Sequence, residues 1–221
     1  GRQRHMTAPP KGHTDAETPR YNGLLGLTLV ASVLGPLPVY MAGALVVLIR
    51  ADLDLGQASL GLAVSSFFLA SALASIPGGR LGEAIGPFRA MAIGSTVTAT
   101  ATVTLATATT TFWHVAAYLA VAGIGNAVIQ PSTNTAVTMS VPAGRHGLAF
   151  GVKQAAGPGA ALIAGLTVPF IGLTLGWRWA FGLSALLSAV LAVAWSRRGA
   201  SWTRAGTPRG HLIGSRRHLA V

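Results

Sequence analysis

The sequence contains no cysteine and few charged residues. Its 221 residues include 5 acidic side chains and 16 lysines and arginines, so only 10% of the chain is charged. A soluble domain normally carries roughly a quarter charged residues, and the shortage indicates that lipid is the surrounding solvent. The absence of cysteine excludes disulfide frameworks and thiolate metal sites. We therefore expect no cofactor and no metal centre.

Catalytic constellations are also missing from the sequence. The 6 histidines lie mostly in the polar ends, and neither His114 nor His146 has metal-ligand spacing to a carboxylate. No Ser-His-Asp set, pair of acids or phosphate-binding loop is apparent. We expect a protein that is not an enzyme.

Basic residues are plentiful, and they give a formal net charge of +11. Such a charge can select nucleic-acid phosphates, but here it is spread over the two ends and the short gaps between apolar runs. This distribution favours the positive-inside rule over nucleic-acid binding. It predicts a multi-pass protein of the cell (inner) membrane with both termini cytoplasmic. The tryptophans expected at its two interfaces are Trp113, Trp177 and Trp179 outside and Trp195 inside.

Long apolar runs make up most of the chain. A run of about 20 residues can cross a hydrocarbon layer of ~30 Å as a helix. The predicted fold class is thus an all-α membrane protein, with a six-helix transmembrane domain over residues 23–195. Residues 1–22 are predicted to be a polar cytoplasmic tail, and residues 196–221 a basic, disordered cytoplasmic tail. The predicted spans are residues 23–49, 57–78, 88–111, 113–137, 147–173 and 177–195.

Two of these runs allow another interpretation. The first contains Ala42-Gly43-Ala44, which resembles a signal-peptide cleavage site, but its apolar run is longer than the roughly 7 to 15 residues of a signal sequence. In the third, threonines alternate with valine and alanine from Thr96 to Thr104, as in a strand. An open strand cannot lie alone in lipid, whereas threonine hydroxyls can bond to carbonyls one helical turn earlier. A helix is predicted in both cases.

The gap between the second and third runs reads GGRLGEAIGPFRAM, residues 78–91. This stretch resembles the cytoplasmic loop signature of the major facilitator superfamily, Gly-x-Leu-Ala-Asp-Arg-x-Gly-Arg-Lys. Its glycines permit a tight turn, and its acid is expected near the start of the following helix, where the helix dipole favours anions. The matching positions are Gly79, Leu81, Glu83 in place of aspartate, and Gly86, with Arg89 one position late.

Further resemblance extends over residues 23–195. GVKQAAGPGAALIAGLTVP and the later GWRWAF resemble the fifth and sixth helices of cyanate-type transporters in that superfamily, whereas Lys153, Ala161 and Leu162 replace glycines of the drug-antiporter signature. The resemblance implies the N-terminal six-helix half of a transporter, built from two inverted three-helix repeats. It also implies a solute site at the membrane midplane, between this half and a second one.

Prolines interrupt the leading helix of each implied repeat. They are Pro36 and Pro38 in the first span and Pro131 in the fourth. Paired interruptions of this kind point to a transporter's site, although proline and glycine are also common in membrane helices generally. We therefore interpret these prolines as helix bends beside a candidate site.

Carboxamides recur every four residues along the fourth span, at Asn126, Gln130 and Asn134. This spacing places them in one stripe on a helix. Carboxamides that faced lipid would be unsatisfied, so the stripe should face protein or water. It lines a cavity or it bonds neighbouring helices together.

Lys153 lies near the middle of the fifth span, about 12 Å along the helix axis from Arg145. A lysine at this depth costs about 2.5 to 3.5 kcal/mol on insertion scales. Its ammonium is expected to turn, with Gln154, toward a cavity or to snorkel to the inner headgroups. Small residues recur every four positions on another face of this span, from Gly147 to Gly159, and predict close helix packing.

These features predict secondary transport of a small polar or anionic solute by alternating access, as a symporter or uniporter. Lys153 would bind the solute with hydrogen bonds from Asn126, Gln130, Asn134, Gln154 and Tyr40, and the loop around Glu83 would gate the cytoplasmic side. The expected partners are the lipid bilayer, the solute and a second six-helix half from this or another chain. Two alternatives stay open, namely a truncated half that does not transport and a non-transporting membrane adaptor.

Overall fold

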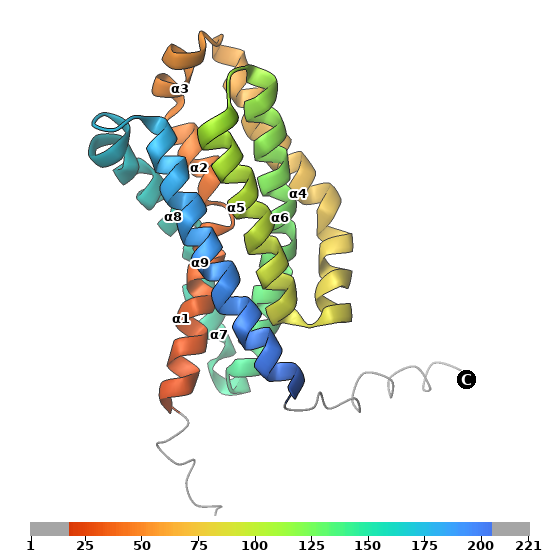
Figure 1. Cartoon of the computed structure of the whole chain (residues 1–221). Coiled ribbons are helices and arrows are strands. Elements are labelled where there is room, and N and C mark those ends of the chain that lie inside the picture. Colours follow the sequence, from red (N-terminus) through yellow and green to blue (C-terminus); the bar gives the residue numbers. More distant parts are fainter. Residues whose placement is uncertain (1–17, 205–221) are drawn as a thin grey trace, which may run out of the picture.

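The computed structural model describes residues 18–204, with side chains for residues 23–200 apart from 57, 60 and 143. The regular structure in this part is helical, and the helices form one bundle (Figure 1). Among residues 18–204, five helices are long and apolar enough to cross a membrane, and a bent pair counted as one further span brings the number to six. The predicted fold class is therefore confirmed. The elements are α1 Thr18–Leu34, α2 Leu37–Ala44, α3 Val46–Leu53, α4 Gln57–Ile85, α5 Pro87–Ala108, α6 Phe112–Ser140, η1 Ala143–Arg145, α7 His146–Gln154, α8 Ala156–Thr167, η2 Val168–Gly172 and α9 Trp177–Arg204.

The first span is broken between α1 and α2. The two helices meet at 43°, with Gly35 and Pro36 between them. Pro36 has no backbone N–H and cannot continue the hydrogen bonding of the preceding turn, so α1 ends at Leu34. The break falls at the first of the two prolines expected to bend this span.

One residue, Gly86, separates α4 from α5. Its φ of 86° lies in the left-handed region that favours glycine. Because α4 extends through the loop motif to Ile85, Glu83 lies in the last turn of α4. The expectation that this acid lies at the start of the following helix is wrong.

The threonine-rich third span is helical, as predicted. The hydroxyls of Thr96, Thr100 and Thr104 donate to carbonyls four residues earlier, over 2.9, 3.0 and 2.8 Å. Each hydroxyl is thereby satisfied within its own helix. A pattern that alternates like a strand can thus be placed in lipid as α5.

Helix α6 packs closely on α4 because glycines lie at the contact. A Cβ on Gly123 would overlap the carbonyl oxygen of Phe67, and a Cβ on Gly78 would lie 2.7 Å from the carbonyl oxygen of Ala127. Pro131, expected to interrupt this span, lies inside α6 without ending it. It removes the N–H that would bond to Ala127, and that carbonyl faces Gly78 of α4.

The fifth span consists of α7, α8 and the π-helical turn η2, and the sixth span is α9. Helix α9 continues past Trp195, the predicted end of the span, to Arg204. Polar residues beyond the hydrocarbon layer carry no insertion cost and can extend a helix. The described part of the predicted disordered tail, residues 196–204, is therefore helical, and residues 1–17 and 205–221 lie outside the described residues.

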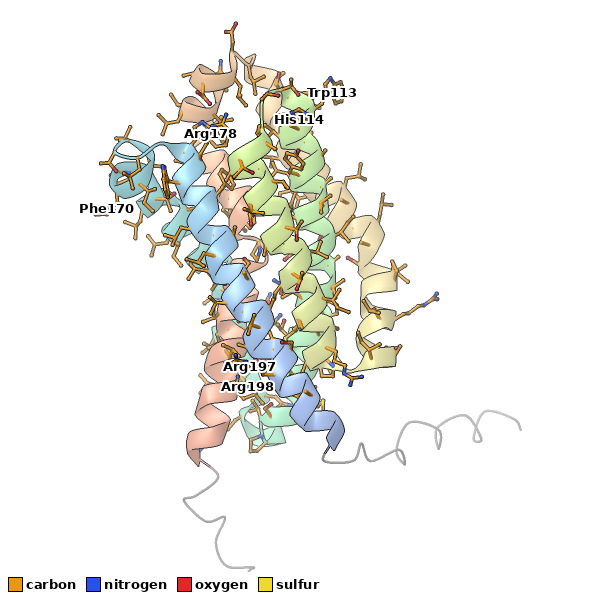
Figure 2. All side chains as sticks on the ribbon, in the orientation of Figure 1. Trp113, His114, Phe170, Arg178, Arg197 and Arg198 are labelled. Carbon is orange, nitrogen blue, oxygen red and sulfur yellow. The ribbon has the colours of Figure 1, made fainter. Side chains whose placement is uncertain are left out.

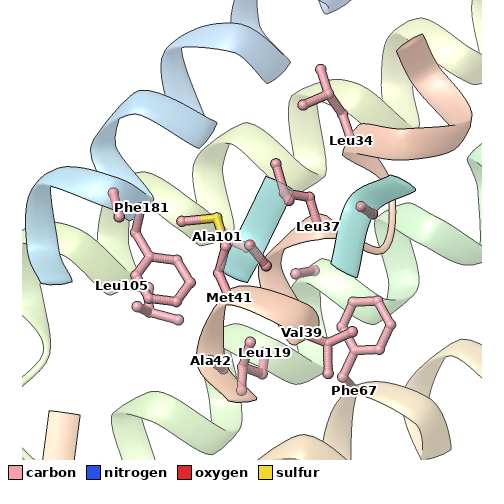
Figure 3. Close-up of a cluster of buried hydrophobic side chains, with 14 of the residues drawn as sticks. Leu34, Leu37, Val39, Met41, Ala42, Phe67, Ala101, Leu105, Leu119 and Phe181 are labelled. Atoms are coloured by element: carbon pink, nitrogen blue, oxygen red, sulfur yellow. The ribbon is translucent and has the colours of Figure 1, made fainter. Parts of the chain in front are cut away.

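The core forms where α2 crosses the interior of the bundle. Figure 3 shows Leu37 and Met41 of α2 in a cluster with Leu105 of α5, Leu119 of α6 and Phe181 of α9. Each of these side chains is at most 3% exposed. The broken first span therefore contributes to the centre of the structure.

Two of the four tryptophans expected at the interfaces are buried instead. Trp195 stacks on Phe88 with 5.8 Å between ring centroids, and both Trp195 and Trp177 lie inside the bundle, whereas Trp113 and Trp179 are exposed. Hydropathy reports the depth of a residue along a span but not the direction in which its side chain points.

Arg178 joins three elements at the end of the bundle where α3 lies (Figure 2). Its guanidinium donates to a carboxylate oxygen of Asp52 over 3.2 Å and to the carbonyls of Ala106 and Thr109 over 3.2 and 2.9 Å. Trp177 Nε1 donates to the same oxygen of Asp52 over 3.2 Å. A cation is favourable at a helix C-terminus, so Arg178 caps α5 while it holds α3 against α9.

Replacing Arg178 with alanine is expected to lower the free energy of unfolding by about 2 kcal/mol, because two carbonyls lose a charged donor. Asp52→Asn should cost less than about 1 kcal/mol, since the ion pair is partly exposed and asparagine can still accept hydrogen bonds. Thermal unfolding of the two variants in detergent measures the difference. Equal losses would show that the ion pair, and not the cap on α5, carries the stabilisation.

Candidate functional site

A chain of polar side chains crosses the bundle beside the break in the first span. Lys153 Nζ in α7 donates to Gln130 Oε1 in α6 over 3.1 Å. Gln130 Nε2 donates to Asn126 Oδ1 over 3.4 Å, and Asn126 Nδ2 donates to Ser71 Oγ in α4 over 3.1 Å. This row of hydrogen-bonded side chains therefore links the fifth, fourth and second spans.

Lys153 is buried, with 4% of its surface exposed. Of the two orientations open to it, the structure has the ammonium directed into the bundle, where it meets a neutral carboxamide. The described acidic residues, Asp52, Asp54 and Glu83, are all exposed. The hydrogen bond to Gln130 offsets part of the cost of burying the ammonium but leaves its charge uncompensated by a carboxylate.

Pro36 explains why Gln130 lies where it does. A proline removes the N–H that would bond to the carbonyl four residues earlier, and that carbonyl belongs to Ser32. Gln130 Nε2 donates to the Ser32 carbonyl over 3.3 Å. The carboxamide of α6 thus replaces the hydrogen bond that the proline removes from α1.

Gly35 brings the broken span close enough for this contact. A Cβ at Gly35 would lie 2.7 Å from Asn126 Oδ1 and 3.6 Å from Gln130 Nε2. A Cβ at this position would displace the Asn126 carboxamide and contact that of Gln130. Ser32, Gly35 and Ser71 were not among the predicted site residues, because each is brought to the site by a helix far from α6 in the sequence.

The other predicted solute-binding residues lie outside this row of hydrogen-bonded side chains. Tyr40 in α2 is half-buried, and its hydroxyl oxygen lies 3.8 Å from the position of a Cβ on Gly157 in α8. Asn134 and Gln154 are exposed. The predicted stripe on α6 therefore divides, because Asn126 and Gln130 are half-buried and hydrogen-bonded within the bundle, whereas Asn134 is exposed on its surface.

The small residues of the fifth span also lie on the surface. At Gly147, Gly151 and Gly159, a Cβ would meet no atom of another described helix within 4 Å. The close packing predicted for this ridge is not found among the described residues. Together with Asn134 and Gln154, the ridge gives the bundle surface polar and small residues beside the buried lysine.

The predicted loop-motif residues lie apart from the polar chain, at the end of the bundle where α4 meets α5. Gly79, Leu81 and Glu83 belong to the end of α4, Gly86 forms the turn and Arg89 lies in the first turn of α5. Both described ends of the chain, at α1 and α9, lie at this same end (Figure 1).

Comparisons with known proteins identify the family through a family model. Residues 28–218 match the family model described as Major Facilitator Superfamily. An uncharacterised MFS-type transporter of Mycobacterium tuberculosis is 30% identical over 133 residues, which are 60% of this chain and 23% of that protein. A probable sphingolipid transporter of Arabidopsis thaliana, spinster homolog 1, is 26% identical over 145 residues, which are 66% of this chain and 29% of that protein.

The fold is similar to that of a solved transporter. The inward-open xylose transporter XylE from E. coli matches 80% of this chain and 48% of its own length, with a TM-score of 0.66 and 17% sequence identity. The chain thus spans about half of this structure and less than a third of the two curated relatives.

Proposed function

Because the chain belongs to the Major Facilitator Superfamily, we propose that it forms the N-terminal six-helix half of a secondary transporter for a small anionic solute. We also propose that it belongs to the cyanate-type subgroup, because the sequence around Lys153 resembles that subgroup. The proposed orientation places the loop motif and both described chain ends on the cytoplasmic side of the inner membrane, in accord with the basic residues there.

The buried ammonium of Lys153 is the observation that carries this proposal. Among the described residues it donates one hydrogen bond, to Gln130, and an ammonium has three N–H donors. Within the described part of the chain, Asn126 likewise uses one of its two N–H groups, on Ser71. The site thus offers spare donors and a positive charge, which suit an anion.

The exposed side of the site fits contact with a second half. Solutes of such carriers bind at the midplane between two six-helix units. Asn134, Gln154 and the glycine ridge of α7 and α8 lie on that surface, where a facing helix could approach the small residues closely. We propose that alternating access requires this second unit, supplied by the same protein, a second copy or another chain, and that Glu83 and its loop gate the cytoplasmic side.

Uptake and binding of small anions test this function together. We expect the chain in lipid nanodiscs to bind small organic or inorganic anions, and Lys153→Met to weaken that binding about a hundredfold, because a buried charged contact is worth several kcal/mol. Lys153→Arg retains the charge and should lose less. Anion binding that is equal in the wild type and Lys153→Met would overturn the assignment of the site.

Uptake into proteoliposomes separates a self-sufficient carrier from an incomplete one. Uptake by the chain alone, lost in Lys153→Met, would indicate that copies of the chain pair to transport. Binding without uptake would indicate a half that needs another unit. Neither binding nor uptake, together with a protein captured in detergent, would instead support a membrane adaptor.

A further inference from the structure

A groove runs between α5 and α9 on the surface of the bundle, apart from the polar chain. The two helices pack side by side along their length (Figure 1), with Phe88 stacked on Trp195 at one end and Arg178 bound to the carbonyl of Ala106 at the other. Between these contacts the groove has a volume of about 540 Å³ and a lining of small residues that includes Ala99.

The groove continues toward the end of the bundle where the loop motif lies. A second section of about 340 Å³ shares Thr96, Ala192 and Val193 with the first and reaches Ile93 and Ser196. From Ile93 to Val103 the helix rises about 15 Å, at 1.5 Å per residue. This length is about half of the ~30 Å hydrocarbon layer, so the groove matches the chains of a single leaflet.

Two arginines lie near the end of the groove at the loop motif, one on each of its two helices. Arg89 precedes Ile93 by four residues on α5, and Arg197 follows Val193 by four residues on α9, so helical spacing places each arginine one turn beyond a lining residue and on the same side of its helix. Both are exposed, and the Cγ of Arg89 lies 3.0 Å from the Cβ position of Gly199 in α9. Figure 2 shows Arg197 in the part of α9 toward its C-terminal end, where Gly199 also lies.

We propose that this groove binds one anionic phospholipid of the leaflet at the loop-motif end, with an acyl chain between α5 and α9 and the phosphate between Arg89 and Arg197. Basic residues between helices at a membrane surface recognise anionic headgroups, and guanidinium groups bind phosphate with paired hydrogen bonds. A second copy of the chain fits less well, because copies in one membrane share an orientation and would bring like-charged arginines to the same level.

Native mass spectrometry of the full chain in detergent tests this site, with phosphatidylglycerol and phosphatidylcholine of identical acyl chains as probes. We expect the wild type to retain phosphatidylglycerol more strongly. Arg89→Gln and Arg197→Gln should each weaken its retention about fivefold, since each basic residue contributes about 1 kcal/mol at an anionic surface. Arg80→Gln removes an exposed arginine of α4 outside the groove and is expected to have no effect.

Ala189→Leu tests the groove itself. Ala189 is an exposed lining residue, so a leucine can fill the groove without entering the core, and retention of both lipids should fall. Phosphatidylglycerol retention that is unchanged in Arg197→Gln and in Ala189→Leu would overturn the proposal. Loss of a dimer in Ala189→Leu, with lipid retention unchanged, would assign the groove to a second copy instead. Circular dichroism confirms that each variant is folded.

Discussion

Replacing Gly123 with leucine is expected to prevent the chain from reaching its folded state. The side chain would enter the space of the Phe67 backbone, because a Cβ at this position already overlaps the carbonyl oxygen of Phe67 and lies 3.0 Å from its carbonyl carbon. Overpacking that forces side chains and backbone to shift typically costs about 1–3 kcal/mol and occasionally more, and the overlap with backbone here places this substitution at the upper end. Size-exclusion chromatography and thermal unfolding of the chain in detergent measure the loss.

Gly61→Leu is the matched control for this substitution. Gly61 lies in α4, and nothing lies within 4 Å of its Cβ position, so leucine adds the same volume on an open face. We expect this variant to elute and unfold like the wild type. If Gly123→Leu were as stable as Gly61→Leu, α4 and α6 would not be in backbone contact at this point.

Replacing Gln130 with leucine should destabilise the chain by about 2 to 3 kcal/mol. The substitution leaves the Lys153 ammonium without its acceptor and the Ser32 carbonyl without its donor, and buried polar groups that lose a partner are costly. Lys153→Met is expected to cost little or to stabilise the chain, because it removes the charge that is expensive to insert. Thermal unfolding in detergent measures each change.

The double variant Lys153→Met/Gln130→Leu decides how the lysine is oriented. It should be more stable than Gln130→Leu alone by about 2 kcal/mol, since no ammonium remains without an acceptor. Distant side chains show additive effects within about 0.5 kcal/mol. Additive losses in this cycle would therefore mean that Lys153 reaches the headgroups and does not depend on Gln130.

Composition and run length were enough to predict the helical membrane fold, because lipid requires long apolar segments with satisfied backbones. They did not predict where helices end in polar surroundings. Glu83 lies at the end of α4 and Arg204 at the end of α9, and both residues are polar, so hydropathy does not report that the helix continues through them. The burial of Trp195 depends on its stacking with Phe88, a contact that no local pattern reports.

The candidate site was predicted in part. Helical spacing placed Asn126 and Gln130 in one stripe, and the cost of inserting Lys153 required a partner for it. Which partner it has could not be read from the sequence, because spacing along one helix does not show which other helix lies opposite. One pattern did contain the missing link: Pro36 leaves the Ser32 carbonyl without a donor in α1.

The hydrogen bond to Ser32 gives Gln130 two partners, one at the bend of the first span and one in the candidate site. The same carboxamide holds the Ser32 carbonyl at the bend and accepts from Lys153. If the proposed solute draws Gln130 away from Ser32, it must lower the stability of the bend, and by thermodynamic reciprocity a change in the bend must alter the affinity for that solute by the same factor. In the proposed transporter, the angle of the first span and the occupancy of the solute site would therefore be two readouts of one equilibrium.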